Sequence, residues 1–194
     1  MKIKLILLNA LIVLVFTVNA QQKYKLAEST SKLIVEGTSS VHDWTMNSTD
    51  FSSTVQFEIE NGILVKISDV NFSCPSKKIV SDNSIMNSKT QKALKSEDHP
   101  NIIFKFISIK SLTNQKNDFS GEITGTLSIA GKSKQIVFPF SGKVDPNGII
   151  YVKGIVPIKM TDYNIEPPTA MMGALKTGDE VKINYSFQFV QSIN

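Results

Sequence analysis

Cysteine and histidine are scarce in this sequence. Its 194 residues include one cysteine and two histidines. A lone cysteine excludes an internal disulfide. A tetrahedral zinc site needs three or four nitrogen or sulfur ligands at recognisable spacing, and these residues do not provide them. We therefore predict no metal and no cofactor, and we expect Cys74 to be a small apolar core residue because free cysteine is usually buried.

The sequence also lacks a marked excess of charge of one sign. The formal net charge is +4, from 21 basic and 17 acidic residues. Residues 1–20 contain two lysines, so the remaining chain has 19 basic and 17 acidic residues and a net charge of about +2. Its lysines are scattered. This balance favours neither nucleic acid nor an acidic membrane surface as a partner.

No apolar run is long enough for a typical membrane span. The longest, Leu5 to Val18, follows two lysines and ends at Val18-Asn19-Ala20. A spanning helix needs about 20 apolar residues, whereas a basic start, a shorter apolar run and small residues at the end are typical of a signal peptide. We predict cleavage after Ala20, leaving one periplasmic or secreted domain, residues 21–194, without stable membrane insertion. An uncleaved anchor is the alternative.

Most of the remaining chain alternates apolar and polar residues, which is typical of strands with one buried face. One example has Val55 and Phe57 before Asn61-Gly62, with Ile63, Val65 and Ile67 after it, and Asn-Gly between such runs predicts a hairpin. Further turns are expected at Asn117-Asp118, Ala130-Gly131-Lys132 and Asp145-Pro146-Asn147-Gly148.

About eight long antiparallel strands are expected, and exposed sheet edges favour closure of such a sheet. We predict an all-β, antiparallel, lipocalin-like eight-stranded barrel with one or two short helices. Gly121, Gly125 and Gly142 lie within strand patterns, where glycine permits the bends that closure needs. A β-sandwich remains the alternative, because alternation does not distinguish the two folds.

Two segments interrupt the strand pattern. Between Asp82 and Lys95, the apolar residues follow a helical spacing, with Asp82 or Ser84 as the expected cap. The segment from Asp162 to Glu180 is too long for a hairpin turn. We expect a loop through Pro167-Pro168, followed by one or two helical turns that end near Gly173.

Glu97-Asp98-His99 comes before Pro100 and resembles a catalytic or metal-binding cluster. Proline lacks an amide hydrogen and disfavours helical geometry in the residue before it, so the helix must end here. Neighbouring residues in an extended chain point to opposite sides. The cluster is therefore interpreted as the turn from helix to strand.

The other candidate acid–base residues do not form a recognisable set. His42 and Asp43 are adjacent and face opposite sides of a strand, and the core is the expected place for Trp44. Asp162 and Glu166 could serve a glycosidase only if they flanked a cleft. The sequence contains no Gly-x-Ser-x-Gly motif. We predict that no residue is catalytic, and a hydrolase using His42, Asp162 or Glu166 is the least favoured hypothesis.

Large apolar side chains are more abundant than acid–base candidates. Each of these side chains is expected to fill a packed core, but an eight-stranded barrel can also hold a small ligand. Methionine is flexible and suits a surface that adapts to an apolar guest. The candidate ligand-binding residues are Phe104, Phe106, Leu127, Ile129, Phe138, Phe140, Met160, Tyr163, Met171, Met172, Leu175 and Phe187.

The sequence resembles the YceI-like family of periplasmic polyisoprenoid-binding proteins from about Tyr24 to Val190. The resemblance rests on "YKLAESTSKLIVEG", "ALKSEDHPNIIFKF", "GEITGTLSIAGKSKQIVFPFSG", and "IKMTDYNI" followed by "GDEVKINYSFQF". The most specific parts are Gly125 to Lys134 and "HPNIIF". The family commonly has arginine where Met160 stands and glycine where Asn164 stands, so a polar contact from that arginine is not implied here.

This resemblance implies a lipocalin-like barrel without catalysis that holds a polyisoprenoid, an isoprenoid quinone or a fatty-acid-like lipid. Transport, storage or stress protection would be its purpose. By analogy, the helix expected between Asp82 and Lys95 and the segment from Asp162 to Glu180, which we call the Met-rich segment, border or cap the cavity. The alternative is a secreted barrel with a filled core that binds protein or carbohydrate through its loops. The sequence does not decide whether the protein forms a homodimer.

Overall fold

Long antiparallel strands form most of the structure, a computed structural model that describes residues 22–48 and 50–192. The expected signal peptide lies outside these residues. The strands are β1 Gln22–Leu26, β2 Lys32–Ser39, β3 Trp44–Ser48, β4 Ser52–Glu60, β5 Ile63–Pro75, β6 Asn101–Gln115, β7 Asp118–Ile129, β8 Lys132–Val144, β9 Ile150–Lys159, β10 Thr169–Ala170 and β11 Leu175–Gln191. The helix α1 spans Ser84–Ala93, and the 3-10 turns are η1 Glu28–Thr30, η2 Ser76–Lys78, η3 Met160–Tyr163 and η4 Met171–Gly173.

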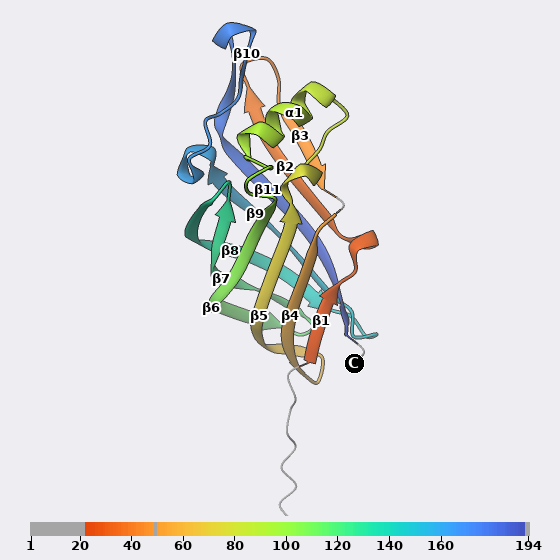
Figure 1. Cartoon of the computed structure of the whole chain (residues 1–194). Coiled ribbons are helices and arrows are strands. Elements are labelled where there is room, and N and C mark those ends of the chain that lie inside the picture. Colours follow the sequence, from red (N-terminus) through yellow and green to blue (C-terminus); the bar gives the residue numbers. More distant parts are fainter. Residues whose placement is uncertain (1–21, 49, 193–194) are drawn as a thin grey trace, which may run out of the picture.

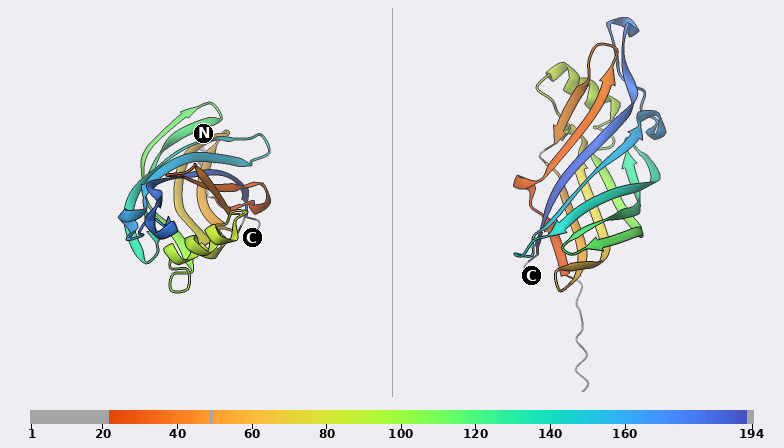
Figure 2. Two further views of the ribbon diagram at one scale, coloured as in Figure 1. Left: turned by 90° about the horizontal axis from the view of Figure 1, so that it is seen from above. Right: turned by 180° about the vertical axis from the view of Figure 1, so that it is seen from behind.

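The sheet closes on itself (Figures 1 and 2). Its neighbours run in the order β1, β4, β5, β6, β7, β8, β9, β11, and β11 pairs again with β1. The predicted eight-stranded antiparallel barrel is thus confirmed, and the sandwich alternative is not what the chain forms.

The long strand β11 sets the height of the barrel. Its last residues pair with β1, whereas its earlier residues, from Thr177 to Ser186, pair with β2. The strand β3 pairs with β2 and reaches Val80 through a bridge from Asn47. The strands β2 and β3 therefore extend the wall beyond the ring, toward the end where α1 and β10 lie (Figure 1).

The Asn61-Gly62 hairpin between β4 and β5 is confirmed, and both residues have positive φ. The expected inward row after it is only partly correct, however. Ile67 is buried as expected, but Ile63 and Val65 are exposed and Leu64 is buried, because the register shifts between Glu58 and Ile59. A β-bulge of this kind moves the following side chains to the opposite face.

Three other turns agree closely with the sequence. The β7–β8 and β8–β9 connections fall at the expected residues, whereas the β6–β7 connection is Lys116-Asn117, one residue earlier than expected. The strand glycines lie at close approaches: a Cβ on Gly121 would stand 2.1 Å from the Ser111 carbonyl oxygen. Register shifts in β6 lie beside this contact, which places the bend where glycine allows it.

The predicted helix is present but shorter than Asp82 to Lys95, and its cap differs from both expected residues. Asn83 caps α1, since its side chain accepts hydrogen bonds from the amides of Ile85 and Met86 at 3.0 and 3.1 Å. Its backbone is extended, as a cap requires. Lys95 has positive φ just after the helix.

The Met-rich segment, Asp162 to Glu180, agrees with the expectation in part. Residues 165–168 form the expected loop through Pro167-Pro168, and the single turn η4 ends at Gly173 as expected. The short strand β10 and the early start of β11 were not expected, and they arise because Thr169 and Ala170 pair with Lys176 and Leu175. Methionine and alanine favour helix locally, but backbone pairing with β11 prevails here. In the described part of the chain, no helix is both long and apolar enough to cross a bilayer.

Candidate functional site

The barrel contains an apolar cavity of about 560 Å³. This volume lies in the range of about 300–1,000 Å³ that is usual for small-molecule sites. The lining residues come from every barrel strand except β1, and from β2, β3, α1, η3 and β10 as well. A filled core, the alternative expectation, is therefore wrong for this barrel.

Alternation in β11 supplies the longest row of lining residues. Its members lie two apart, so they point to the same face of the strand. They are Val181, Ile183, Tyr185, Phe187 and Phe189. Because β11 runs the height of the barrel, this row gives the cavity its length.

Aromatic rings form a continuous series along one side of the cavity. Phe104 and Phe138 meet edge to face with centroids 4.5 Å apart, and Tyr185 and Phe187 lie 5.2 Å apart. Phe72 stacks on Phe187 at 5.8 Å. Such pairs are worth about 0.5–1.5 kcal/mol beyond their area burial, so they hold the wall in place without filling the interior.

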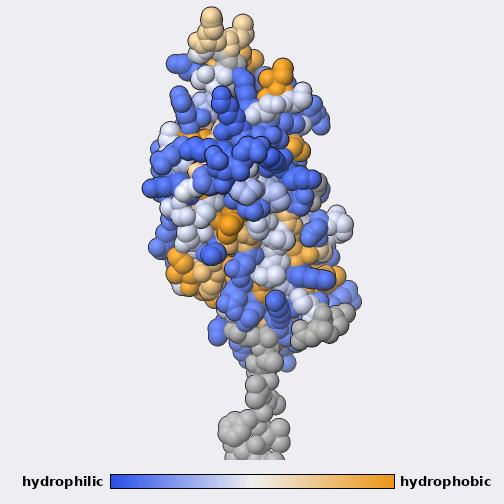
Figure 3. Space-filling model, viewed as in Figure 1, coloured by the Kyte–Doolittle hydropathy of each residue, from blue (hydrophilic) through white to orange (hydrophobic). Residues whose placement is uncertain are grey.

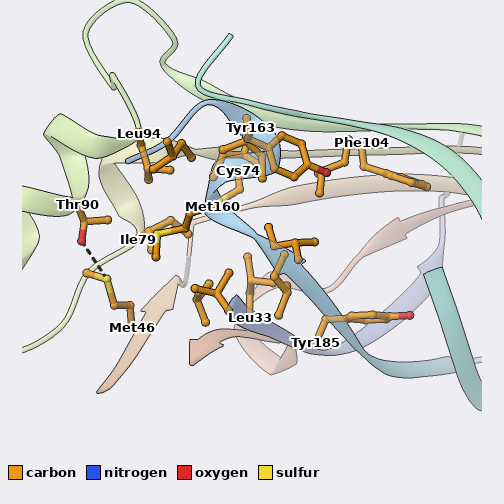
Figure 4. A pocket seen from close by; sticks show the side chains of 18 of the residues that line it. Leu33, Met46, Cys74, Ile79, Thr90, Leu94, Phe104, Met160, Tyr163 and Tyr185 are labelled. Atoms are coloured by element: carbon orange, nitrogen blue, oxygen red, sulfur yellow. Dashed lines mark hydrogen bonds between the residues drawn. The ribbon is translucent and has the colours of Figure 1, made fainter. Parts of the chain in front are cut away.

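Nine of the twelve predicted ligand-binding residues line this cavity, as Figure 4 illustrates for Phe104, Met160 and Tyr163. The nine are Phe104, Leu127, Ile129, Phe138, Phe140, Met160, Tyr163, Leu175 and Phe187. Their contact with a ligand stays a prediction.

The other three predicted residues do not line it. Phe106 is half-buried, and the register of β6 shifts directly after it, which interrupts the alternation on which the prediction rested. Met171 and Met172 lie at the tip of the β10–β11 hairpin and are exposed. The expected lid residues thus face solvent in this structure, although Pro168 and Thr169 before them line the cavity.

The helix α1 contributes a full face to the cavity. The five residues whose spacing predicted the helix, Ile85, Met86, Lys89, Ala93 and Leu94, all line it, together with Thr90. The Thr90 hydroxyl donates to the sulfur of Met46 on β3 at 3.2 Å (Figure 4). The expectation that the helix borders the cavity agrees with this placement.

Several lining residues were not predicted. They include Leu33 on β2, Met46 on β3 and Phe72 on β5, which all lie in alternating patterns that indicate one buried face. Sequence alternation could have identified them as inward-facing. It could not show that β2 and β3 extend the cavity beyond the ring, since that depends on long-range pairing.

Polar groups gather at the end of the cavity near α1 and β10. The Lys89 ammonium donates to the Thr169 carbonyl oxygen at 2.7 Å, which joins α1 to β10. Lys176 and His42 also line this end. The Ser40 amide donates to the Lys176 carbonyl oxygen at 2.9 Å, so the β2–β3 turn is tied to β11. These contacts define the mouth.

Tyr163 carries a polar atom into the apolar interior. Its ring is buried, and its hydroxyl has no hydrogen-bond partner among the described residues. Burial, with a further contribution from the Asp162 charge, raises the pKa of Tyr163 to about 12. The phenol is therefore neutral at physiological pH. In contrast, the Tyr185 hydroxyl donates to the Pro139 carbonyl oxygen at 2.7 Å.

The turn η3, which holds Tyr163, is anchored to β11. The Thr161 amide and hydroxyl donate to the two carboxylate oxygens of Asp179 at 2.9 and 2.6 Å. Both hydrogen bonds lower the pKa of Asp179, and the bond from the Thr161 hydroxyl has the larger effect. These bonds fix the turn that places Met160 and Tyr163 against the cavity.

Burial agrees with the interpretation of Cys74. The side chain is fully buried, lines the cavity and donates to the Ser48 hydroxyl oxygen at 3.5 Å. Burial raises the pKa of the thiol, and a thiol kept protonated is a poor nucleophile.

The structure separates the acid–base candidates. Asp162 pairs with Lys134 at 2.7 Å, and Glu166 is exposed. Glu97 pairs with Lys77 at 2.7 Å, while His99 packs beneath Gly131 of the β7–β8 turn. His42 lies at the mouth, with its Nδ1 2.6 Å from the Asp43 carbonyl oxygen. Within residues 22–48 and 50–192, no three His, Cys, Asp or Glu side chains are grouped to hold a metal ion.

Known proteins share this architecture. The protein BcnA of Burkholderia cenocepacia is 17% identical, with a TM-score of 0.68 over 84% of this chain and 98% of its own. A polyisoprenoid-binding domain from Saccharophagus degradans is 13% identical, with a TM-score of 0.67 over 89% and 100%. The YceI protein of Campylobacter jejuni is 20% identical, with a TM-score of 0.59 over 77% and 85%.

At these identities, the solved structures show the fold alone. A comparison with curated proteins gives no match. The sequence model of the YceI-like domain family matches residues 24–189, which make up nearly the whole barrel. The chain therefore belongs to the YceI-like family.

Proposed function

We propose that this protein binds one amphiphilic lipid, with the hydrocarbon chain inside the barrel and the polar head at the mouth. The observation that supports this most is the cavity itself: its interior is lined by aliphatic and aromatic side chains, and its lysines lie only at the mouth. Each buried methylene contributes about 0.8 kcal/mol, so a long chain can be held without a charged contact.

The comparisons support the same class of ligand. The Saccharophagus degradans domain, which shares this fold, is described as polyisoprenoid-binding. A polyisoprenoid, an isoprenoid quinone or a fatty-acid-like lipid all consist of a flexible apolar chain with a small polar end. We infer a carrier or storage protein in the periplasm or outside the cell, which acts without catalysis.

Two matched tryptophan variants test the cavity as the binding site. Val152 points into the cavity, whereas Val137 on the neighbouring strand β8 is exposed on the outer wall. Val152→Trp should lower the affinity for a fluorescent long-chain polyene fatty acid at least about tenfold, because the indole takes the space of the chain. Val137→Trp should leave the affinity unchanged.

The measurement is a fluorescence titration of the purified protein, with circular dichroism to check that both variants fold. Saturation at one probe per barrel in the wild type, lost only in Val152→Trp, is the expected result. Equal binding by both variants would place the probe outside the barrel and contradict the proposal.

A further inference from the structure

Exposed apolar side chains surround the mouth of the cavity. They are Val41 in the β2–β3 turn, Ile85 on α1, and Met171 and Met172 at the tip of the β10–β11 hairpin. Val41 and Ile85 also line the mouth. We call these four residues the apolar rim. Figure 3 shows apolar surface at the tip of the molecule, where β10 and η4 lie in Figure 1.

The methionines are the most exposed part of this rim. Met171 is 74% exposed and Met172 is 101% exposed, so neither packs on the barrel. Both have positive φ, 48° and 55°. A left-handed conformation is unfavourable for a residue with a Cβ, and glycine, asparagine or aspartate would adopt it more easily. Two large apolar side chains therefore stand where folding favours small or polar ones.

The three segments of the rim are held in fixed positions. The contact of Lys89 with Thr169 joins α1 to β10, and the contacts between Ser40 and Lys176 join the β2–β3 turn to β11. The rim therefore consists of separate protruding side chains on a braced frame. Protruding apolar side chains of this kind suit insertion into the interfacial region of a lipid bilayer.

We propose that the apolar rim inserts into the surface of a lipid bilayer, so that the cavity mouth opens against the membrane. This inference rests on the proposed lipid binding, because a hydrocarbon chain that enters or leaves the cavity through an inserted rim avoids water. Lys89 and Lys176 at the mouth would lie at headgroup level, where anionic lipids attract them. Asp43 and Asp82 are also exposed next to the rim segments, so apolar insertion is the main attraction.

A pair of double variants tests the rim. Met171→Asp with Met172→Asp places two carboxylates at the tip, and aspartate tolerates the left-handed backbone there. The control is Ile107→Asp with Ile155→Asp, which changes two residues that are 51% and 56% exposed and lie on β6 and β9, outside the rim. Both variants should keep the circular dichroism of the barrel.

Binding is measured by flotation with vesicles of phosphatidylcholine, alone or with about one third phosphatidylglycerol. The wild type should float with both, and more strongly with the anionic vesicles. The rim variant should lose at least about tenfold in its partition coefficient, while the control stays within about twofold.

Three results would overturn the proposal: no flotation of the wild type, an equal loss in both variants, or flotation that depends on anionic lipid and not on the methionines. Titration of the same variants with the fluorescent fatty acid keeps the two proposals apart. A rim variant that still takes up the probe but does not float shows that docking fails while the cavity works. Failure of the wild type to take up the probe counts against the cavity proposal, and flotation of the same protein then decides separately whether the rim binds a membrane.

Discussion

Single residues adjust the family's pattern to this cavity. Asn164 stands where the family commonly has glycine, and its φ of 55° and ψ of 32° are left-handed. Asparagine is among the few other residues that adopt this conformation readily, so the turn after η3 is preserved. Met160, where the family commonly has arginine, lines the cavity with an apolar side chain. The site in this chain thus lacks a cation at that position.

The two cavity tyrosines should respond in opposite ways to loss of the hydroxyl. The Tyr163 hydroxyl is buried without a partner among the described residues, whereas the Tyr185 hydroxyl donates to Pro139. Tyr163→Phe removes an unsatisfied polar group and should raise the free energy of unfolding by about 1 kcal/mol. Tyr185→Phe should lower it by about the same amount.

Urea unfolding of the lipid-free protein measures both changes. The urea concentration at the midpoint of unfolding is compared between variants whose free energy falls with urea at the same slope. Destabilisation by Tyr163→Phe would contradict the structure here, because it would mean that the hydroxyl has a partner in the folded protein.

At the scale of elements, the strands that can be predicted are those whose local sequence pattern agrees with the folded structure. The inward row of β11 follows its alternation from Val181 to Phe189, and Asn61-Gly62 specifies its hairpin through backbone geometry. Prediction failed where pairing partners decide the outcome. The bulge after Phe106 results from backbone pairing with β7, and the β10–β11 hairpin from backbone pairing that overrides a local preference for helix.

The same distinction applies to the candidate site. Residues within regular strands, such as Leu127 and Phe138, were placed correctly on the cavity side. The position of α1 over the mouth depends on contacts between residues far apart in the chain, such as Lys89 with Thr169. No local pattern encodes such a contact, so the sequence alone could indicate the helix and its apolar face but not the mouth.

The cap of α1 offers a stability test at this scale. Asn83→Ala removes the side-chain acceptor for two amides and should lower the free energy of unfolding by about 1 kcal/mol. Asp82→Ala is the matched control. Its side chain was an expected cap and does not serve as one here, so its change should stay within about 0.5 kcal/mol.

Chemical unfolding of the two variants distinguishes the assignments. A larger loss in Asp82→Ala than in Asn83→Ala would mean that the helix begins one residue earlier than in this structure.

At the scale of the whole molecule, closure of the sheet creates the site. Eight strands leave an interior that side chains can fill or that can hold one small ligand, and here β2, β3 and α1 lengthen it beyond the ring. The apolar walls of the cavity lead to the end of the barrel where α1 and β10 lie (Figure 1), and the lysines of the mouth and the apolar rim are at this same end. Cleavage after Ala20 and dimerisation stay predictions.

The most direct measurement is native mass spectrometry of the protein after mild purification, followed by organic extraction of the same sample. We expect a mass excess that corresponds to one lipid per chain, release of that lipid into the organic phase, and loss of the excess in Val152→Trp. Protein that carries no lipid, and that takes up none when incubated with long-chain isoprenoids or fatty acids, would contradict a barrel built to hold a hydrocarbon chain.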